Sequence, residues 1–349
     1  MVYKLAQTEP KVQRRSKRMN EDKEAPVLTL EFASIYYPYF GKLLDGRYMS
    51  DGIDLVWHYV TPPDAIFRQV IESAPYDLAE MSLSAYTMLR ERGWDRYIGL
   101  PIFTSRRFRH SALFVKAESD IVSGEQLRGK RVGLPEYHMT AAVWVRGILR
   151  EDFGVDPREI QWFTGGAERP GRVERIELPA EIAARIHPIG QNETLFSMLL
   201  DGRLDAVMCA HKPQLARKSG SPIRYLFPDC KEVEKKYYLR HRIFPIMHIL
   251  VLKRGLQADE KDIASRIHRL LQNLKEDFYK KVAIVRNSSV FPWIDEYIDE
   301  IAEMMGEDPW AHGISKNAQV LNKFLDYSYS QGLIQKKPGL EELFIDLDD

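Results

Sequence analysis

Arginines and a histidine gather directly after an apolar run in the first third of the chain. Arg106, Arg107, Arg109 and His110 follow residues 97–103, which are apolar enough to form a buried strand. Guanidinium groups match carboxylates and phosphates bidentately. The cluster therefore predicts a clamp for a small anion, with Arg106 and Arg109 as its ligands. The alternative is a solvated basic loop, because runs of charge usually face water.

A second candidate lies in the turn at 133–142, where a predicted strand passes into a predicted helix. The free N–H groups at such a helix start favour an anion. Thr140 is expected to cap the helix or to donate its hydroxyl. Glu136 and His138 are candidate proton carriers, with surface or capping roles as the alternative.

Ser82 and Ser84 occupy the corresponding turn in the first half of the chain. Their side chains and the helix start that follows offer further donors to an anion. Two helix N-termini that face each other across one cleft suit a ligand with two acidic groups.

A single histidine, His248, lies inside the apolar run 244–251. A lone histidine in such a run is most simply a core residue with its hydrogen bonds satisfied. Burial shifts the pKa of an imidazole, however, and a proton-transfer residue exploits such a shift. His248 is therefore either a core residue or a proton-transfer residue.

Several kinds of site are excluded or weakly supported. The glycine-rich loop 165–172 has neither a Walker nor a dinucleotide-binding spacing. The nine histidines show no H-E-x-x-H motif and no matching cysteine spacing. No cofactor is expected, although a divalent metal is left open.

The bulk composition narrows the class of protein. The chain has 349 residues with 50 basic and 50 acidic side chains. A neutral chain argues against nucleic acid or a membrane as the main partner. Cys209 and Cys230 cannot build a disulfide framework, and no secretory signal is recognisable. We therefore expect a cytoplasmic protein, and a homo-oligomer is left open.

Strands and helices alternate along most of the chain, which predicts mostly parallel sheets flanked by helices. Strands are expected at 27–32, 53–60, 76–81, 97–103, 111–116, 127–134, 204–208 and 243–253, and helices at 63–71, 82–92, 140–153, 194–200 and over most of 259–331. A chain of this length favours two lobes. We expect one lobe from 27–112 plus 246–349, a second from 113–245, and crossings near 110–116 and 243–252. Residues 1–26 are expected to form a disordered basic arm, with a nucleic-acid tail or targeting signal as the alternative.

The chain resembles the 4,5-dihydroxyphthalate decarboxylase family, whose members have a type II periplasmic-binding-protein fold. The resemblance covers residue 28 to the C-terminus. It is carried by Leu44-Asp45-Gly46, Gly52-Ile53-Asp54-Leu55, Ala79-Glu80-Met81-Ser82-Leu83-Ser84, Ser105-Arg106, Phe108-Arg109-His110-Ser111, Gly133-Leu134-Pro135-Glu136-Tyr137, Met139-Thr140-Ala141, Trp144, Arg146-Gly147-Ile148-Leu149, Gly165-Gly166, Pro170-Gly171-Arg172, Leu226-Phe227-Pro228-Asp229, Phe244-Pro245-Ile246-Met247-His248 and Gln331-Gly332-Leu333. One departure stands out, because this chain has Tyr37-Pro38-Tyr39 where the family pattern has Tyr-Asp-Arg.

The resemblance implies loss of CO₂ from a hydroxylated aromatic carboxylate held between the lobes. The expected proton carriers are His110, His248 and Glu136, and the expected substrate ligands are Arg106, Arg109, Ser82, Ser84, Tyr137, Thr140 and Tyr37. A non-catalytic binding protein for a small carboxylate, or another ring-acid lyase on the same scaffold, is the alternative.

Overall fold

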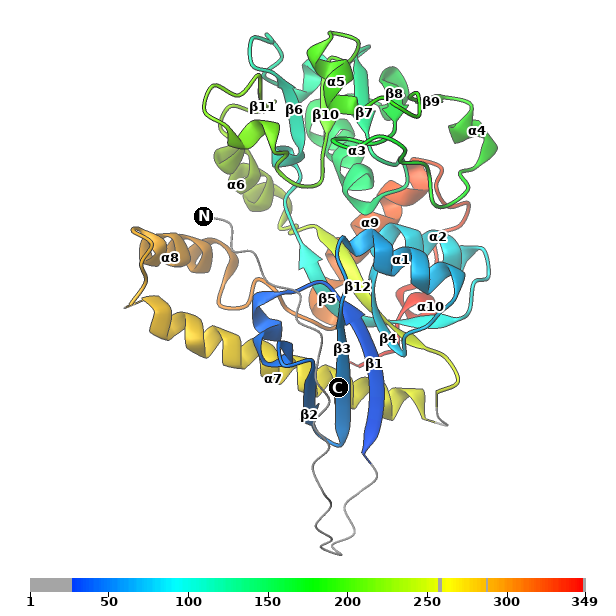
Figure 1. Ribbon diagram of the computed structural model, residues 1–349, viewed down its shortest axis with the longest axis vertical. Helices are drawn as coiled ribbons and strands as arrows, with labels where there is room; N and C mark the ends of the chain where they lie inside the picture. The colour runs from blue at the N-terminus through cyan, green and yellow to red at the C-terminus, as the bar shows by residue number, and fades with distance from the viewer. Residues whose placement is uncertain (1–26, 257–258, 287, 348–349) are drawn as a thin grey trace, which may run out of the picture.

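The computed structural model describes residues 27–256, 259–286 and 288–347, within which the strands form two six-stranded sheets. Each sheet is the centre of one lobe, and the lobes lie one above the other (Figure 1). The predicted basic arm at 1–26 lies outside the described residues.

The first sheet takes its strands from two distant parts of the chain. Its order is β2-β3-β1-β4-β12-β5. The bounds are β1 Leu28–Ser34, β2 Arg47–Ser50, β3 Ile53–Tyr59, β4 Leu78–Ser82, β5 Tyr97–Arg106 and β12 Ile246–Lys253. Strands β3, β1 and β4 run parallel, whereas β12 is antiparallel to both β4 and β5. The beginning of β12 therefore meets the end of β4.

The second sheet is built from the middle of the chain, in the order β11-β6-β10-β7-β8-β9. Its strands are β6 Leu113–Lys116, β7 Arg131–Leu134, β8 Gln161–Thr164, β9 Ile186–Pro188, β10 Ala206–Met208 and β11 Ile223–Tyr225. Strands β10, β7, β8 and β9 are parallel, and β6 is antiparallel to β10 and β11. Two mixed, mainly parallel sheets with flanking helices confirm the predicted two-lobed α/β fold.

Helices cover both faces of each sheet. They are α1 Pro63–Glu72, α2 Leu83–Glu91, α3 Thr140–Phe153, α4 Ala180–Ala183, α5 Leu195–Leu200, α6 Cys230–His241, α7 Glu260–Arg286, α8 Ile294–Met305, α9 Ala318–Ser330 and α10 Leu340–Leu343. Apolar residues of α7 pack on one face of the first sheet, and those of α1 and α2 pack on the other. On the second sheet, α5 packs against one face and α3 packs against the other.

The stretch before β6 differs from expectation. Residues 111–116 were predicted to be extended, but His110–Ala112 form a 3-10 turn in which the Ala112 amide donates to the Arg109 carbonyl at 3.1 Å. This local turn satisfies backbone groups that have no ladder partner, so β6 starts only at Leu113. The chain therefore crosses between the sheets at 107–112 and returns at 242–245.

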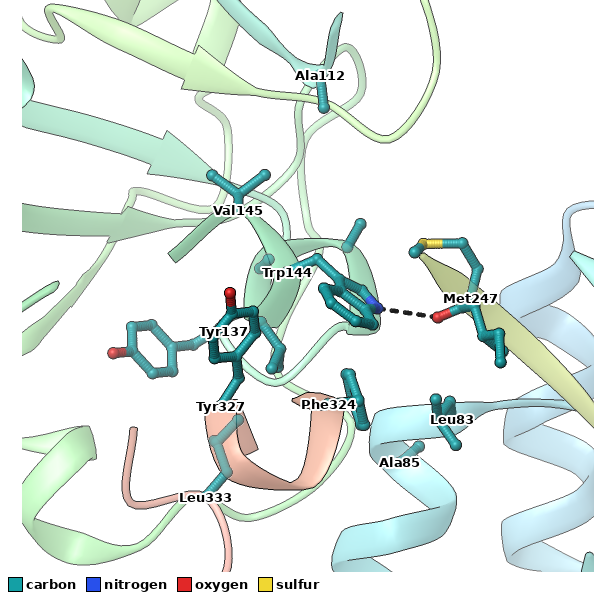
Figure 2. Close-up of a cluster of buried hydrophobic side chains, with 14 of the residues drawn as sticks. Leu83, Ala85, Ala112, Tyr137, Trp144, Val145, Met247, Phe324, Tyr327 and Leu333 are labelled. Carbon is teal, nitrogen blue, oxygen red and sulfur yellow. Dashed lines mark hydrogen bonds between the residues drawn. The ribbon is translucent and has the colours of Figure 1, made fainter. Parts of the chain in front are cut away.

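One hydrophobic core runs through both lobes. It includes Met81 and Leu83 from the first sheet's side, Trp144 on α3, and Phe324 on α9. The Trp144 indole donates to the Ile246 carbonyl at 2.9 Å, at the start of β12 (Figure 2).

Helix α9, which follows the first lobe's long helices in sequence, packs against α3 of the second lobe. A Cβ at Gly147 would lie 2.1 Å from the Tyr327 ring, so only glycine permits this approach. The lobes thus share buried packing in addition to the two chain crossings. None of the helices in the described residues is both long and apolar enough to cross a membrane.

Candidate active site

The carboxyl ends of the parallel strands of both sheets meet between the lobes. Ser82 ends β4, and His248, near the start of β12, is paired with it. The Thr140 hydroxyl of the second lobe lies 2.9 Å from the Ser82 hydroxyl and accepts from the Ser84 amide at 3.0 Å. The starts of α2 and α3 therefore face each other, in the region where open α/β sheets bind ligands.

Glu80, on β4, is fully buried and is the centre of a hydrogen-bond cluster. Its Oε1 accepts from the Tyr37 hydroxyl and from the Thr104 hydroxyl at 3.2 Å, and its Oε2 accepts from the Ile35 amide at 3.0 Å. His248 Nδ1 lies 2.6 Å from the same Oε1. So many donors fix a buried carboxylate as an acceptor.

Tyr37 and Tyr39 form the wall beside Glu80, with their rings stacked at 5.5 Å. The Tyr39 hydroxyl donates to the Thr104 carbonyl at 3.1 Å. Burial first, and the negative charge of Glu80 second, raise the pKa of both tyrosines well above the ordinary value. Tyr37 therefore stays a donor to Glu80 at physiological pH.

His248 is held by Glu80 on one side and by an aromatic ring on the other. The Phe67 ring on α1 meets the imidazole edge to face, with centroids 5.0 Å apart. The pairing of β12 with β5 shifts register on both sides of His248, and such bulges re-aim side chains. In the described part of the chain no partner occupies Nε2, and 18% of the side chain is exposed. This nitrogen is available to a ligand.

A second buried carboxylate, Glu136, lies just past β7. Arg172 donates to its Oε1 through Nε at 2.6 Å, and Arg175 donates to its Oε2 through Nε at 2.8 Å. Burial raises the pKa of Glu136, but His138, Arg175 and Arg172 together outweigh burial and hold it below the ordinary value. Glu136 is thus an ionised anchor for two arginines.

The two clusters adjoin one another through α1. Phe67 contacts His248 and also lies under the Arg175 guanidinium, whose Cζ is 5.7 Å from the ring centroid. Arg175 donates to the Asp64 carbonyl at 3.3 Å, and Arg172 Nη2 lies 3.8 Å from the Asp64 carboxylate. The imidazole of His248 and the guanidinium of Arg175 therefore both contact one phenyl ring, at the junction of the lobes.

Two known proteins are similar to this chain in sequence. A 4,5-dihydroxyphthalate decarboxylase from Comamonas testosteroni is 33% identical over 318 residues, which cover 91% of this chain and 96% of that protein. A second 4,5-dihydroxyphthalate decarboxylase, from Pseudomonas putida, is 37% identical over 213 residues, which cover 60% of this chain and 81% of that protein. This chain belongs to the 4,5-dihydroxyphthalate decarboxylase family. No protein-family model matches it.

The fold has a counterpart among solved structures. The periplasmic aliphatic sulphonate binding protein SsuA from Escherichia coli aligns with a TM-score of 0.50 at 15% identity, over 92% of this chain and 98% of that chain. This likeness supports the periplasmic-binding-protein fold that the family resemblance implied.

The arginines predicted to form the clamp in this family member are engaged by the protein itself. Arg106 donates to the Ala311 carbonyl at 2.8 Å and to the Asn317 side chain. Arg109 donates to the Ala210 carbonyl at 2.9 Å, and its Nε lies 2.9 Å from the Met247 sulfur. Burial lowers the pKa of Arg106 to about 10 and that of Arg109 to about 9. Their assignment as substrate ligands stays a prediction.

The remaining predicted residues fall into two groups. Tyr37, Ser82, Ser84, Thr140, Glu136 and His248 all lie in the contacts described above, at the junction of the lobes. His110 instead packs against the Phe227 and Tyr237 rings, and Tyr137 packs against Trp162 and under the Arg146 guanidinium. The catalytic and binding roles of both groups stay predictions.

Several residues of the site were not selected from sequence as functional, among them Glu80, Asp64, Phe67, Arg172, Glu174 and Arg175. Glu80 carried a signal, because it is an acid inside the apolar stretch 78–81. Arg175 carried none, since it lies in an irregular segment between β8 and α4.

A metal centre is a poor fit to the second cluster. Glu136, His138 and Glu174 present ligand atoms within 4.8 Å of one another, the grouping among the described residues that could hold an ion. However, both Glu136 oxygens already accept from guanidinium groups, and His138 Nδ1 lies 2.7 Å from Glu174. A divalent cation would have to displace these partners against the charge of two arginines.

Proposed function

We propose that this protein removes CO₂ from a hydroxylated aromatic carboxylate, of the 4,5-dihydroxyphthalate type, bound between its two lobes. The observation that supports this most is the His248–Glu80 pair at 2.6 Å, with the second imidazole nitrogen left for a ligand. Family membership supplies the reaction class, and the pair supplies the group that the reaction requires.

The chemistry needs one proton delivered to carbon. Protonation of the ring carbon that bears the carboxylate forms a new C–H bond and leaves an electron-poor ring. The C–C bond to the carboxylate then breaks, its electron pair restores the aromatic ring, and CO₂ leaves. A hydroxyl group para to that carbon stabilises the electron-poor ring as it passes its proton to solvent, and it regains a proton from solvent once the ring is aromatic again.

In this mechanism His248 delivers the proton from Nε2, and the Glu80 carboxylate stabilises the imidazolium through Nδ1. A well-placed acid of this kind contributes about 10²–10⁴-fold to the rate. Tyr37 and Thr104 keep Glu80 oriented by donating to it. The substrate's own hydroxyl-bearing ring accepts the electron pair of the broken C–C bond, as a cofactor would in other decarboxylases. The proposal therefore requires no cofactor. We propose that the activity takes place in the cytoplasm and serves the breakdown of phthalate-type acids.

The test is incubation of the purified protein with a panel of hydroxybenzoates and hydroxyphthalates in D₂O. Release of CO₂, with one deuterium at the vacated ring carbon, is the expected result, and dialysis against a chelator should not change the rate. Ligand binding without any CO₂ would support a carrier protein instead, and loss of water in place of CO₂ would support a different lyase.

A variant pair links the activity to the site. His248→Gln should lose turnover by about 10²-fold or more, because its amide cannot deliver the proton. The matched control is His187→Gln, an exposed histidine on β9. Equal turnover in the two variants would remove His248 from the mechanism.

A further inference from the structure

Arg172 and Arg175 are held side by side by one buried carboxylate. Both Nε and Nη2 of Arg172 contact Glu136 Oε1, at 2.6 and 2.5 Å, while Arg175 reaches Oε2 at 2.8 Å. The Glu136 side chain is 1% exposed, whereas those of Arg175 and Arg172 are 12% and 32% exposed. The guanidinium groups therefore lie between the buried anchor and the solvent-accessible junction.

The two guanidinium groups keep donors that Glu136 does not use. Arginine stays protonated at any physiological pH. Among the described residues, no hydrogen-bond partner is found for Arg172 Nη1 or Arg175 Nη2. The Glu174 and Asp64 carboxylates share the charge of this group, but they leave the pair with spare donors of the type that bind a carboxylate bidentately.

A further negative charge comes from the other lobe. Asp64, near the start of α1, lies 3.8 Å from Arg172 Nη2, which is too far for a hydrogen bond. Its carbonyl, rather than its carboxylate, accepts from Arg175 at 3.3 Å. Asp64 is therefore close enough to attract the arginines without using up their donors.

The position relative to His248 is what gives the arginine pair a role in the reaction. Phe67 contacts both the imidazole and the Arg175 guanidinium. We expect the ring of an aromatic acid whose carboxylate bound these arginines to lie on the Phe67 side of the pair, which is the side on which His248 lies. Arg106 and Arg109, in contrast, direct donors to backbone carbonyl groups.

We propose that Arg172 and Arg175 are the ligands of the substrate's carboxylate, and that Asp64 occupies the edge of this anion site until the substrate arrives. The assignment rests on the proposed function for the identity of the substrate. It differs from the sequence-based clamp, because it transfers carboxylate binding to a partly exposed pair in which Arg172 Nη1 and Arg175 Nη2 have no hydrogen-bond partner among the described residues.

The binding test uses phthalate, which has the carboxylates but no ring hydroxyl and so cannot undergo the proposed reaction. Its Kd is measured by titration calorimetry for the wild type, Arg172→Gln and Arg175→Gln. Each variant loses a charge-assisted hydrogen bond, so the Kd should rise by roughly 10–100-fold. The matched control is Arg158→Gln, an exposed arginine of the same lobe that is paired with Asp156.

Asp64→Asn provides a second measurement with the opposite sign. Removal of its charge should tighten phthalate binding, because the incoming carboxylate no longer competes with a resident one. Circular dichroism and thermal unfolding establish that each variant is folded. The proposal is overturned if folded Arg172→Gln and Arg175→Gln bind phthalate as tightly as Arg158→Gln. Should both fail to fold, it is overturned if Asp64→Asn binds phthalate no more tightly than the wild type.

The two proposals fail in different ways. If phthalate binding depends on the two arginines but the protein releases CO₂ from no aromatic acid, the anion site is supported and the decarboxylase function is contradicted. If CO₂ is released and KM is unchanged in both arginine variants, the decarboxylase function is supported and the anion site is contradicted.

Discussion

His248 Nδ1 lies 2.6 Å from Glu80 Oε1, although the two residues are 168 positions apart in the chain. The contact exists because β12 returns from the second lobe and enters the first sheet antiparallel to β4. The crossing of the chain between lobes thus places an imidazole on a carboxylate that is fully buried.

Glu80→Gln should lower the rate of turnover. A neutral amide stabilises an imidazolium at His248 less well than the Glu80 carboxylate does, so we expect kcat to fall by about 10²-fold. Turnover at saturating substrate measures this. Thr104→Val, which removes a donor to Glu80 but leaves its charge, is the control, and an equal loss in that variant would contradict the assignment.

His110 should make the folded state sensitive to mild acid. Burial lowers its pKa from 6.5 to about 4. The unfolded chain then binds a proton at His110 below pH 6.5, whereas the folded protein binds it only below about pH 4. Stability should therefore fall as the pH drops through this window, by up to about 3 kcal/mol.

His110→Phe should flatten that pH dependence, because the phenyl ring keeps the contacts with Phe227 and Tyr237. Urea unfolding between pH 7 and pH 4 measures it. The exposed His187→Phe serves as the control. An unchanged slope in His110→Phe would show that other groups dominate the titration.

Glu136 should contribute stability that disappears at lower pH. Its arginine and histidine partners outweigh burial and hold its pKa below the ordinary 4.5. This contribution is complete above about pH 4.5 and is lost as the pH falls through the folded-state value. At neutral pH, Glu136→Gln should cost about 3 kcal/mol, because the two arginines lose a buried partner.

Chemical denaturation of Glu136→Gln across this pH range is the measurement. Glu177→Gln, an exposed acid of the same segment, is the control. If both variants lose equal stability, the network around Glu136 does not hold the second lobe's loop.

Gly147→Ala tests the packing between lobes. Alanine normally favours a helix over glycine by about 1 kcal/mol, but here its Cβ would lie 2.1 Å from the Tyr327 ring. We expect a net loss of about 1–3 kcal/mol from overpacking. Gly41→Ala, where nothing lies within 4 Å of the added Cβ, should be close to neutral. Combination with Tyr327→Ala should recover part of the loss, and simple additivity would argue against the contact.

Local patterns predicted many of the elements, although β2, β8, β9, β11 and α6 were not expected from them. Helix α3 was expected from its apolar face and from Gly154, and it occupies Thr140–Phe153 with Gly154 in the left-handed conformation. Ser82 was expected to begin α2, and its side chain accepts from the Ala85 amide. These features depend on residues only a few positions apart, which a single sequence displays.

The site was less accessible to prediction because it depends on distant contacts. The sequence showed that Arg106 and Arg109 carry charge, but not that backbone carbonyl groups at Ala311 and Ala210 take up their donors. In the same way, Arg175 gained its importance only when Glu136 and Phe67 were found beside it.

The packing of α9 on α3 has a consequence for biosynthesis. The middle lobe obtains part of its buried surface from residues 318–330, which leave the ribosome after every strand of both sheets. Trp144 and Gly147 therefore lack their contacts with Phe324 and Tyr327 until α9 has been synthesised. A nascent chain at that stage would present an apolar face to chaperones, and the lobes would not be separable into halves that mature independently.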